Sequence, residues 1–337
     1  MDHDDIVRQL ENMPPPDNVS AKKAVNREAN LTKPAGSLGR LEELSAWCAA
    51  WQACYPPRME NTQILVFAGN HGVAVHGVSA FPPEVTHQMV ANFAAGGAAI
   101  NQLAHLHDAD LCVVDLDLDR PTADFTSAPA MSVEDFSAAF GTGYEAVDDE
   151  SDALVVGEMG IGNTTTAAAL SCALYGGDPA EWTGAGTGLD AAGIARKTGV
   201  VAAAMDLHGE DFDNPLEALR RVGGREMVAM AGAVLAARHA RVPVILDGFV
   251  ATAAVSVLER AVPGSLDHTV AGHVSGEPGH RLLLEKLGKQ PLLDLGMRLG
   301  EASGAAVALS VLRCALAAHN GMSTFEDAAV SGKDLGI

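Results

Sequence analysis

Three glycine-rich segments of the sequence carry polar side chains suited to ligand chemistry. The first, residues 157–166 (GEMGIGNTTT), follows a short apolar run and precedes a predicted helix. Gly160 and Gly162 would let the backbone approach a ligand closely. Asn163 or Thr164 could cap the helix, whose free N–H groups attract phosphate. The segment is not a Walker loop, because no Gly-Lys-Ser/Thr follows; a well-capped turn without a ligand fits the same pattern.

The second segment, residues 184–188 (GAGTG), is followed by Asp190 and a predicted helix that contains Lys197. Its spacing does not match the dinucleotide-binding fingerprint, because Leu189 stands where the third glycine belongs. Successive N–H groups could still hold an anion, with Lys197 as its counter-charge about two turns along the helix. Taken alone, a flexible linker with a solvated lysine is the simpler interpretation.

The third segment, residues 295–304, places one carboxylate, Glu301, among apolar and small residues at the predicted start of an alanine-rich helix. Burial would raise its pKa and suit it to act as a general base, whereas the helix dipole would oppose that shift. The alternative is a helix-starting glutamate stabilised by the dipole. Asp247, after the apolar run 244–246, could hold a ribose hydroxyl or cap a loop.

Three histidines near the first apolar run raise the question of a metal site. His71, His76 and His87 match no familiar zinc spacing, so we expect no bound metal. A hydrophobic pocket for an aromatic base, with a few polar groups, fits residues 67–82 better.

Charge and cysteine content limit the partners and the compartment. The net charge of -21 and the pI of about 4.8 disfavour nucleic acid and anionic membrane. The five cysteines are scattered without a CxxC pair, as in reduced cytoplasmic proteins. No stretch has the length and apolarity of a membrane span, and the N-terminus lacks a signal-type apolar run. We therefore expect a cytoplasmic protein.

Short apolar runs that end in Gly, Asn or Asp alternate with helix-like stretches, which indicates an α/β fold. The runs are residues 64–67, 111–114, 154–156, 244–246 and, more weakly, 269–271. Such strands form a Rossmann-like parallel sheet flanked by helices, with the ligand crevice at their carboxyl ends.

The two ends of the chain have helical patterns. Apolar positions are spaced like helix faces within residues 1–58, and residues 302–318 form a long alanine-rich helix. We expect a small helical domain of residues 1–58 with 291–337, beside an α/β catalytic domain of residues 59–290. Residues 119–152 are polar and acidic, and are expected to form a surface excursion.

Eight segments in a fixed order carry a family resemblance. They are KPAGSLGRLEEL at 33–44, FAGNHGVAVHGVSAFPPEVTHQMVANFAAGGAAIN at 67–101, GEMGIGNTTTAAAL at 157–170, GAGTGLD at 184–190, ALRRVGGREMVAMAGA at 218–233, LDGFVATAA at 246–254, EPGH at 277–280 and LDLGMRLGEASGAAVAL at 293–309. In this order they resemble the nicotinate-nucleotide–dimethylbenzimidazole phosphoribosyltransferase family of cobalamin biosynthesis, over nearly the whole chain.

The resemblance implies a reaction. Nicotinate mononucleotide binds by its phosphate, a benzimidazole nitrogen attacks the anomeric carbon, and nicotinate leaves with inversion to give α-ribazole phosphate. No metal or other cofactor is implied, because the donor's pyridinium is already a good leaving group. The family's LGE motif makes Glu301 the base, and Glu158 is implied as a second carboxylate near the site. A small helical domain and a homodimer with active sites near its interface are implied as well.

The resemblance also implies which residues bind the substrates. Those for phosphate and ribose are Gly160, Gly162, Gly186, Thr187, Gly188, Lys197 and, more weakly, Asp247. Those for the aromatic base are Ser79, Phe81, Gln88 and Met159.

Other functions fit parts of the sequence. The same transfer could use another acceptor, such as adenine or a phenol. A non-catalytic nucleotide-binding protein on the same fold is a second alternative, against which the presence of Glu301 argues. A nucleotide-dependent dehydrogenase is a third, against which the missing fingerprint argues.

Overall fold

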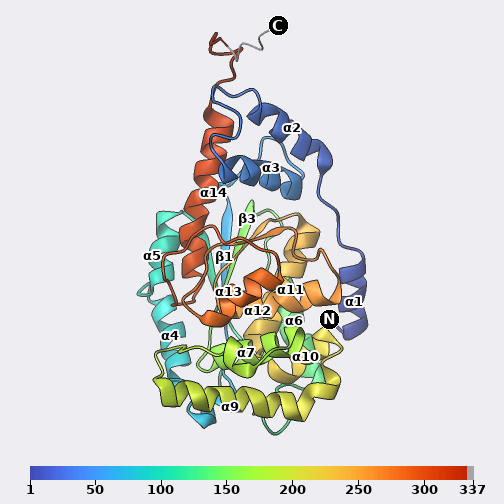
Figure 1. Ribbon diagram of the computed structural model, residues 1–337, viewed down its shortest axis with the longest axis vertical. Helices are drawn as coiled ribbons and strands as arrows, with labels where there is room; N and C mark the ends of the chain where they lie inside the picture. The colour runs from blue at the N-terminus through green and yellow to red at the C-terminus, as the bar shows by residue number, and fades with distance from the viewer. Residues whose placement is uncertain (332–337) are drawn as a thin grey trace.

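Five parallel strands form the centre of the molecule, as the apolar runs predict (Figure 1). The computed structural model describes residues 1–331. The sheet has the order β2-β1-β3-β4-β5, and the weakest of the predicted runs is confirmed as its edge strand. The strands are β1 (Thr62–Ala68), β2 (Asp110–Asp115), β3 (Ala153–Met159), β4 (Val244–Leu246) and β5 (Thr269–Ala271).

Helices connect and cover these strands. Those on the N-terminal side of β3 are α1 (His3–Glu11), α2 (Asn18–Glu28), α3 (Arg40–Gln52), the short η1 (Gly72–His76), α4 (Glu84–Ala94), α5 (Ala99–Leu106) and α6 (Val133–Glu145). Those that follow β3 are α7 (Asn163–Tyr175), α8 (Pro179–Trp182), α9 (Ala191–His208), η2 (Gly209–Asp211), α10 (Pro215–Val222), α11 (Arg225–Ala240), α12 (Phe249–Ala261), α13 (Pro278–Lys286) and α14 (Ser303–Gly321).

The central strands are apolar on both faces because helices cover both faces. Leu65 and Phe67 of β1 point into a core shared with α1, α6, α7, α10, α11 and α12. Ile64 and Val66 point the other way, into a core shared with α3, α5 and α14. Alternate side chains of a strand lie on opposite faces, so continuous apolar runs are what a doubly covered parallel sheet requires.

The strand order creates a ligand crevice. The chain places β2 on one side of β1 and then crosses to place β3 on the other side. Connections therefore leave the neighbouring strands in opposite directions, which opens a crevice beyond their carboxyl ends. Ala68 pairs with Met159 in register, so the segments that follow β1 and β3 begin side by side.

The chain ends meet along α14. In Figure 1, α2 and α3 lie beside the end of α14 that is farther from the strands, while α1 lies lower, against the α/β layers. Arg27 of α2 donates to the carbonyl of His319 at 2.8 Å, and Ser45 of α3 donates to the carbonyl of Ala315 at 3.3 Å. The same apolar core runs from Leu44 of α3 through α14 to Ile64 of β1. The domain boundaries at residues 58 and 291 stay a prediction.

The expectation of a surface excursion at residues 119–152 is wrong for most of that segment. It contains α6, which packs closely on α11 through glycines. A Cβ on Gly143 would lie 1.8 Å from the carbonyl oxygen of Ala229, and a Cβ on Gly232 would lie 2.2 Å from that of Phe140. The polar residues that suggested a surface segment are confined to the outward face of α6 and its flanking loops, whereas Phe136 and Phe140 are buried.

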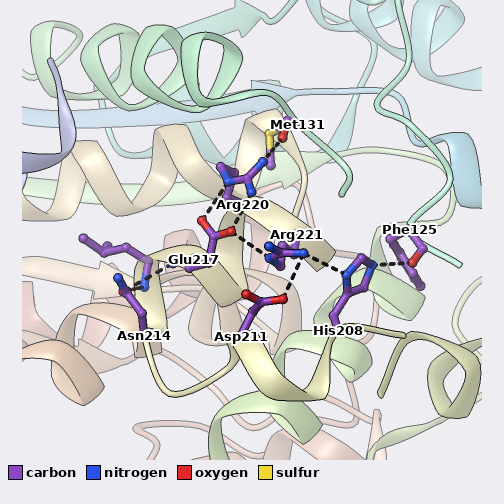
Figure 2. Close-up of polar contacts among 9 residues, drawn as sticks. Phe125, Met131, His208, Asp211, Asn214, Glu217, Arg220 and Arg221 are labelled. Atoms are coloured by element: carbon purple, nitrogen blue, oxygen red, sulfur yellow. Dashed lines mark hydrogen bonds and ion pairs between the residues drawn. The ribbon is translucent and has the colours of Figure 1, made fainter. Parts of the chain in front are cut away.

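The loop before α6 is also held in place, by the arginines of α10 (Figure 2). Arg220 donates to the carbonyl of Met131 at 2.6 Å. Arg221 pairs with Asp211 at 3.1 Å and donates to Nδ1 of His208 at 3.3 Å. The other ring nitrogen of His208 donates to the carbonyl of Phe125 at 2.8 Å. Hydrogen bonds from Arg220 and His208 to backbone carbonyls therefore fasten this loop to α10 and α9.

We predict that Gly143→Ala lowers the free energy of unfolding by roughly 1–3 kcal/mol, because the added methyl group forces two backbones apart. Gly199→Ala is the matched control, since Gly199 lies in exposed helix α9 with nothing within 4 Å of an added Cβ. That control is expected to raise the free energy by about 0.5–1 kcal/mol. Urea unfolding followed by circular dichroism measures both, and equal stabilities for the two variants would contradict the packing described for α6.

Candidate active site

A pocket of about 230 Å³ lies beyond the carboxyl ends of β3, β4 and β5. Five parts of the chain contribute to its walls in addition to Phe81. They are residues 158–164, 186–187, 248–250, 273–277 and 298–300. All three glycine-rich segments singled out in the sequence therefore reach one cavity, as the position of strand ends in a parallel sheet predicts.

The first segment begins α7, but the predicted cap is wrong. The N-cap is Gly162, with φ 98°, and no side chain caps the helix. Since the helix begins at Asn163 itself, the side chains of Asn163 and Thr164 make other contacts. Asn163 donates a very short hydrogen bond to the carboxylate of Glu158, and Thr164 accepts one from Lys197 at 2.8 Å.

Lys197 is fully buried rather than solvated. Its ammonium group donates to the hydroxyl of Thr164 and, at 3.3 Å, to the carbonyl of Gly184. Burial lowers the pKa of Lys197 to about 8, partly offset by the nearby carboxylate of Glu277. Glu277 in turn accepts from the backbone nitrogen of Gly186 at 2.9 Å. The second glycine-rich segment is thus a loop fixed by hydrogen bonds, with the buried ammonium group of Lys197 beside its backbone.

Thr187 joins the second segment to the loop after η1. Its hydroxyl lies 2.9 Å from the hydroxyl of Ser79 and accepts from the backbone nitrogen of Ala80 at 2.9 Å. Phe81 follows directly and lines the pocket, with 53% of its surface exposed. Segments more than a hundred residues apart in sequence therefore meet at the mouth of the pocket.

The predicted binding residues are not all at the pocket wall. Those that line it are Met159, Gly160, Gly186, Thr187 and Phe81, together with Glu158. Ser79 contacts the wall through Thr187, and Lys197 through Thr164. Outside the lining lie the exposed Gln88 and Gly188 and the buried Gly162, Asp247 and Glu301.

Glu301 lies next to Glu158. The backbone nitrogen of Glu301 donates to the carbonyl of Glu158 at 3.2 Å, and the preceding Gly300 lines the pocket. Burial, reinforced by the charge of Asp247, raises the pKa of Glu301 to about 7. Glu301 precedes the N-cap of α14, Ala302, so burial outweighs the opposing helix dipole at this position.

Glu158 is the more strongly perturbed of the two carboxylates. Burial, then the charges of Asp247 and Glu226, raise its pKa well above the ordinary value, against the effect of the Asn163 hydrogen bond. Both carboxyl groups therefore favour the neutral form more than an exposed glutamate does, and Glu301, with a pKa of about 7, is divided between both forms at neutral pH. Two carboxyl groups with different proton affinities beside one pocket can divide the work of holding and accepting a proton.

Each of the three histidines considered for a metal site pairs with a different carboxylate. His71 lies 2.8 Å from Glu226, His76 2.7 Å from Asp124, and His87 3.2 Å from Asp119. Within residues 1–331 no three His, Cys, Asp or Glu side chains are grouped to hold a metal ion.

Several pocket residues were missed from the sequence. Asn163, His273, Ser275, Glu277 and Arg298 all line the cavity. The positions of His273 and Ser275 could have been found, because they follow the weakly predicted strand β5. The contact of Arg298 with the carbonyl of Gly186, at 3.2 Å, joins residues more than a hundred apart and has no local signal.

We predict that Glu301→Gln makes the protein more stable than wild type above pH 7. The pKa of Glu301 is raised from 4.5 to about 7, so the folded state holds this proton more tightly than the unfolded chain. The free energy of unfolding therefore falls between these pH values in wild type, and glutamine removes that decline. The variant's free energy of unfolding minus that of wild type should be roughly 1–3 kcal/mol larger at pH 8 than at pH 4, after allowance for solvent screening.

Denaturant unfolding over this pH range measures the gap. Glu285→Gln, at an exposed site on α13, is the control and should follow wild type at every pH. Parallel curves for wild type and the Glu301 variant would show that Glu301 titrates normally.

Comparisons with known proteins agree with this geometry. A family model described as phosphoribosyltransferase matches residues 13–330. A nicotinate-nucleotide–dimethylbenzimidazole phosphoribosyltransferase from Cereibacter sphaeroides (strain KD131 / KCTC 12085) is 56% identical over 323 residues, 96% of each chain. One of the same name from Ruegeria sp. (strain TM1040) is 61% identical over 306 residues, 91% of this chain and 90% of that one.

A solved structure is similar throughout. The crystal structure of CobT from Thermus thermophilus is 42% identical and superposes with a TM-score of 0.88, covering 94% of this chain and 100% of the other. The ordered motifs, the family model and the solved structure agree, and the chain belongs to the nicotinate-nucleotide–dimethylbenzimidazole phosphoribosyltransferase family.

Proposed function

We propose that this protein transfers ribose phosphate from nicotinate mononucleotide to dimethylbenzimidazole, giving α-ribazole phosphate and nicotinate for the lower nucleotide loop of cobalamin. The names of its relatives favour this acceptor over adenine or a phenol. The observation that supports the reaction best is a pocket with glycine-rich backbone in its wall, where wall residue Thr164 contacts a buried cation, Lys197, and wall residue Glu158 contacts Glu301, whose carboxyl group has a pKa of about 7.

The phosphate and ribose of the donor bind at the glycine-rich segments. Gly160, Gly162 and Thr187 offer backbone N–H groups, and Lys197 supplies positive charge beside them. Gly186 and Gly188, whose N–H groups already donate to Glu277 and to the carbonyl of Ala185, let the backbone come close to the ligand. A buried charge is screened less by solvent than a surface one, so Lys197 can hold a phosphate although the whole chain has a net charge of -21. An approaching phosphate also favours the charged form of this lysine.

The acceptor lies across the pocket, on the side of Phe81 and Met159. Both residues line the cavity and offer apolar surface to a flat ring. Ser79 steadies the mouth through Thr187, and Gln88, exposed on α4, is the remaining predicted contact.

Glu301 is the general base. A ring nitrogen of the acceptor forms the new bond to the anomeric carbon while the bond to nicotinate breaks, and nicotinate leaves with that electron pair. The attack comes from the opposite face, so the configuration inverts. Glu301 takes the N–H proton that the acceptor loses, which its pKa of about 7 permits near neutral pH. Burial and the charges of Asp247 and Glu226 raise the pKa of Glu158, which favours its neutral form beside the donor's phosphate.

We further propose that the protein works as a cytoplasmic homodimer, with an α/β catalytic domain of residues 59–290 and a small helical domain of residues 1–58 and 291–337. Two exposed apolar side chains of the pocket lining, Phe81 and Leu299, support a second copy there. Among residues 1–331, no helix has the length and apolar character needed to cross a membrane.

A chromatographic assay tests the reaction. Purified protein is given nicotinate mononucleotide with dimethylbenzimidazole, unsubstituted benzimidazole, adenine or a cresol. We expect nicotinate release matched mole for mole by a benzimidazole ribotide, fastest with dimethylbenzimidazole. Preferential use of adenine or the cresol would assign another acceptor, and saturable nucleotide binding without release would favour a non-catalytic binding protein.

Two variants should separate chemistry from phosphate binding. Glu301→Gln is expected to lower kcat roughly 100- to 10,000-fold with unchanged affinity for nicotinate mononucleotide, because only proton transfer is lost. Lys197→Met should instead weaken nucleotide binding roughly 10- to 100-fold, the usual loss for a hydrogen bond to a charged group. Lys286→Met removes an exposed lysine of α13 as the control. Calorimetry and steady-state kinetics measure both effects, and normal turnover by the Glu301 variant would refute its role as base.

A further inference from the structure

Asp247 follows strand β4 and His273 follows strand β5, close to the segment that carries Glu301. Asp247 is 1% exposed and lies outside the pocket lining, whereas His273 lines the pocket. We infer that Asp247 is a positioning residue for Glu301: it anchors the turn that carries Glu301, and its charge repels the Glu301 carboxylate. This inference rests on the proposed function of Glu301 and gives Asp247 a role other than contact with ribose.

The turn that carries Glu301 is strained. Glu301 has φ 59° and the next residue, Ala302, has φ 62°, so two successive non-glycine residues adopt the left-handed conformation. Each such residue costs on the order of 1–3 kcal/mol and persists only where the surroundings impose it. Contacts from other parts of the fold must therefore hold this turn.

Asp247 provides one of these contacts. Its Oδ1 accepts from the backbone nitrogen of Ala305, in the first turn of α14, at 2.9 Å. A side chain at the N-cap usually makes this bond, but the N-cap here is Ala302, which has no polar group. A carboxylate from strand β4 thus caps the helix in its place and ties the start of α14 to the sheet.

Close backbone packing encloses the same turn. A Cβ on Gly157 would lie 2.1 Å from the nitrogen of Ala302, and a Cβ on Gly304 would lie 2.1 Å from Cδ2 of His273. The ring of His273 therefore packs against the first turn of α14, with its Nε2 3.4 Å from Oδ1 of Asp247. The start of α14 is thus enclosed by the ends of β3, β4 and β5.

The charge of Asp247 then acts on Glu301. Burial raises the pKa of Glu301 most, and Asp247 is the charged group that adds to this effect. The ionisable groups around the turn of Glu301 are Glu158 at the end of β3, Asp247 after β4, and His273 after β5, which lies against Asp247 and the first turn of α14. Arg298, on Glu301's own segment, is exposed and bound to the carbonyl of Gly186, so Asp247 is not neutralised from that side.

Asp247→Asn tests the two effects separately, because asparagine keeps an oxygen that can accept from Ala305 but loses the charge. With both substrates saturating, kcat should fall at low pH as Glu301 gains its proton. We expect this acidic limb to shift to lower pH by at least about 0.5 units in the variant, and the plateau of kcat to fall several-fold because the base is weaker. KM for the nucleotide should stay unchanged.

Asp17→Asn is the matched control. Asp17 also caps a helix, α2, by accepting from the backbone nitrogens of Val19 and Ser20. It lies outside the pocket lining, so its variant should leave the pH profile where it is. If Asp247→Asn does not fold, Asp247→Ser supplies a second uncharged acceptor.

A carboxyl-carbon NMR titration of Glu301, assigned with Glu301→Gln, gives a readout that needs no turnover. A wild-type protein without transferase activity would refute the proposed function, while the titration would still decide whether Asp247 raises the pKa of Glu301. Unchanged pH profile and titration in Asp247→Asn would overturn the inference. A raised KM for the nucleotide with no shift of the limb would return Asp247 to contact with ribose.

Discussion

The close contact between the first turn of α14 and the ends of the sheet governs the site. Gly157 of β3 and Gly272 after β5 leave no room for side chains, since a Cβ at either would lie within 2.8 Å of α14 backbone atoms. The turn with Glu301 therefore lies directly on the strand ends rather than above a layer of side chains. Any shift of the sheet or of α14 would move this carboxyl group, so the site inherits the rigidity of the core.

The same burial accounts for the electrostatics of the pocket. Glu158, Glu301 and Asp247 are all buried, and the charge of Asp247 adds to the burial that raises the pKa of Glu158 and of Glu301. On the opposite wall Lys197 is buried with Glu277 nearby and has a pKa of about 8. The anionic donor thus finds a positive group and the proton-releasing acceptor finds a carboxyl group, although the overall field of the protein opposes any anion.

Small residues also allow close backbone packing elsewhere in the fold. Gly143 and Gly232 bring α6 and α11 into backbone contact, and alanines of α7 and α12 fill the same core. Helices packed so closely hold their strands firmly, and the Arg221 network fastens the loop between β2 and α6 to the rest. A chain with few aromatic residues gains its packing density from short side chains and near approach of backbones.

The sequence by itself determined the parallel sheet, the helical chain ends and the likeness to one enzyme family, because periodicity, strand-end glycines and motif order are local properties. It also indicated Glu301 and Lys197, but left each with a bland alternative. Only the tertiary structure decided that Lys197 is buried, that Gly162 caps α7, and that α6 belongs to the core. It alone showed that Asp247 contacts the start of α14 and that His273 and Arg298 line the pocket, because those contacts join residues far apart in the chain. Burial and proton affinity likewise depend on what surrounds a group in space.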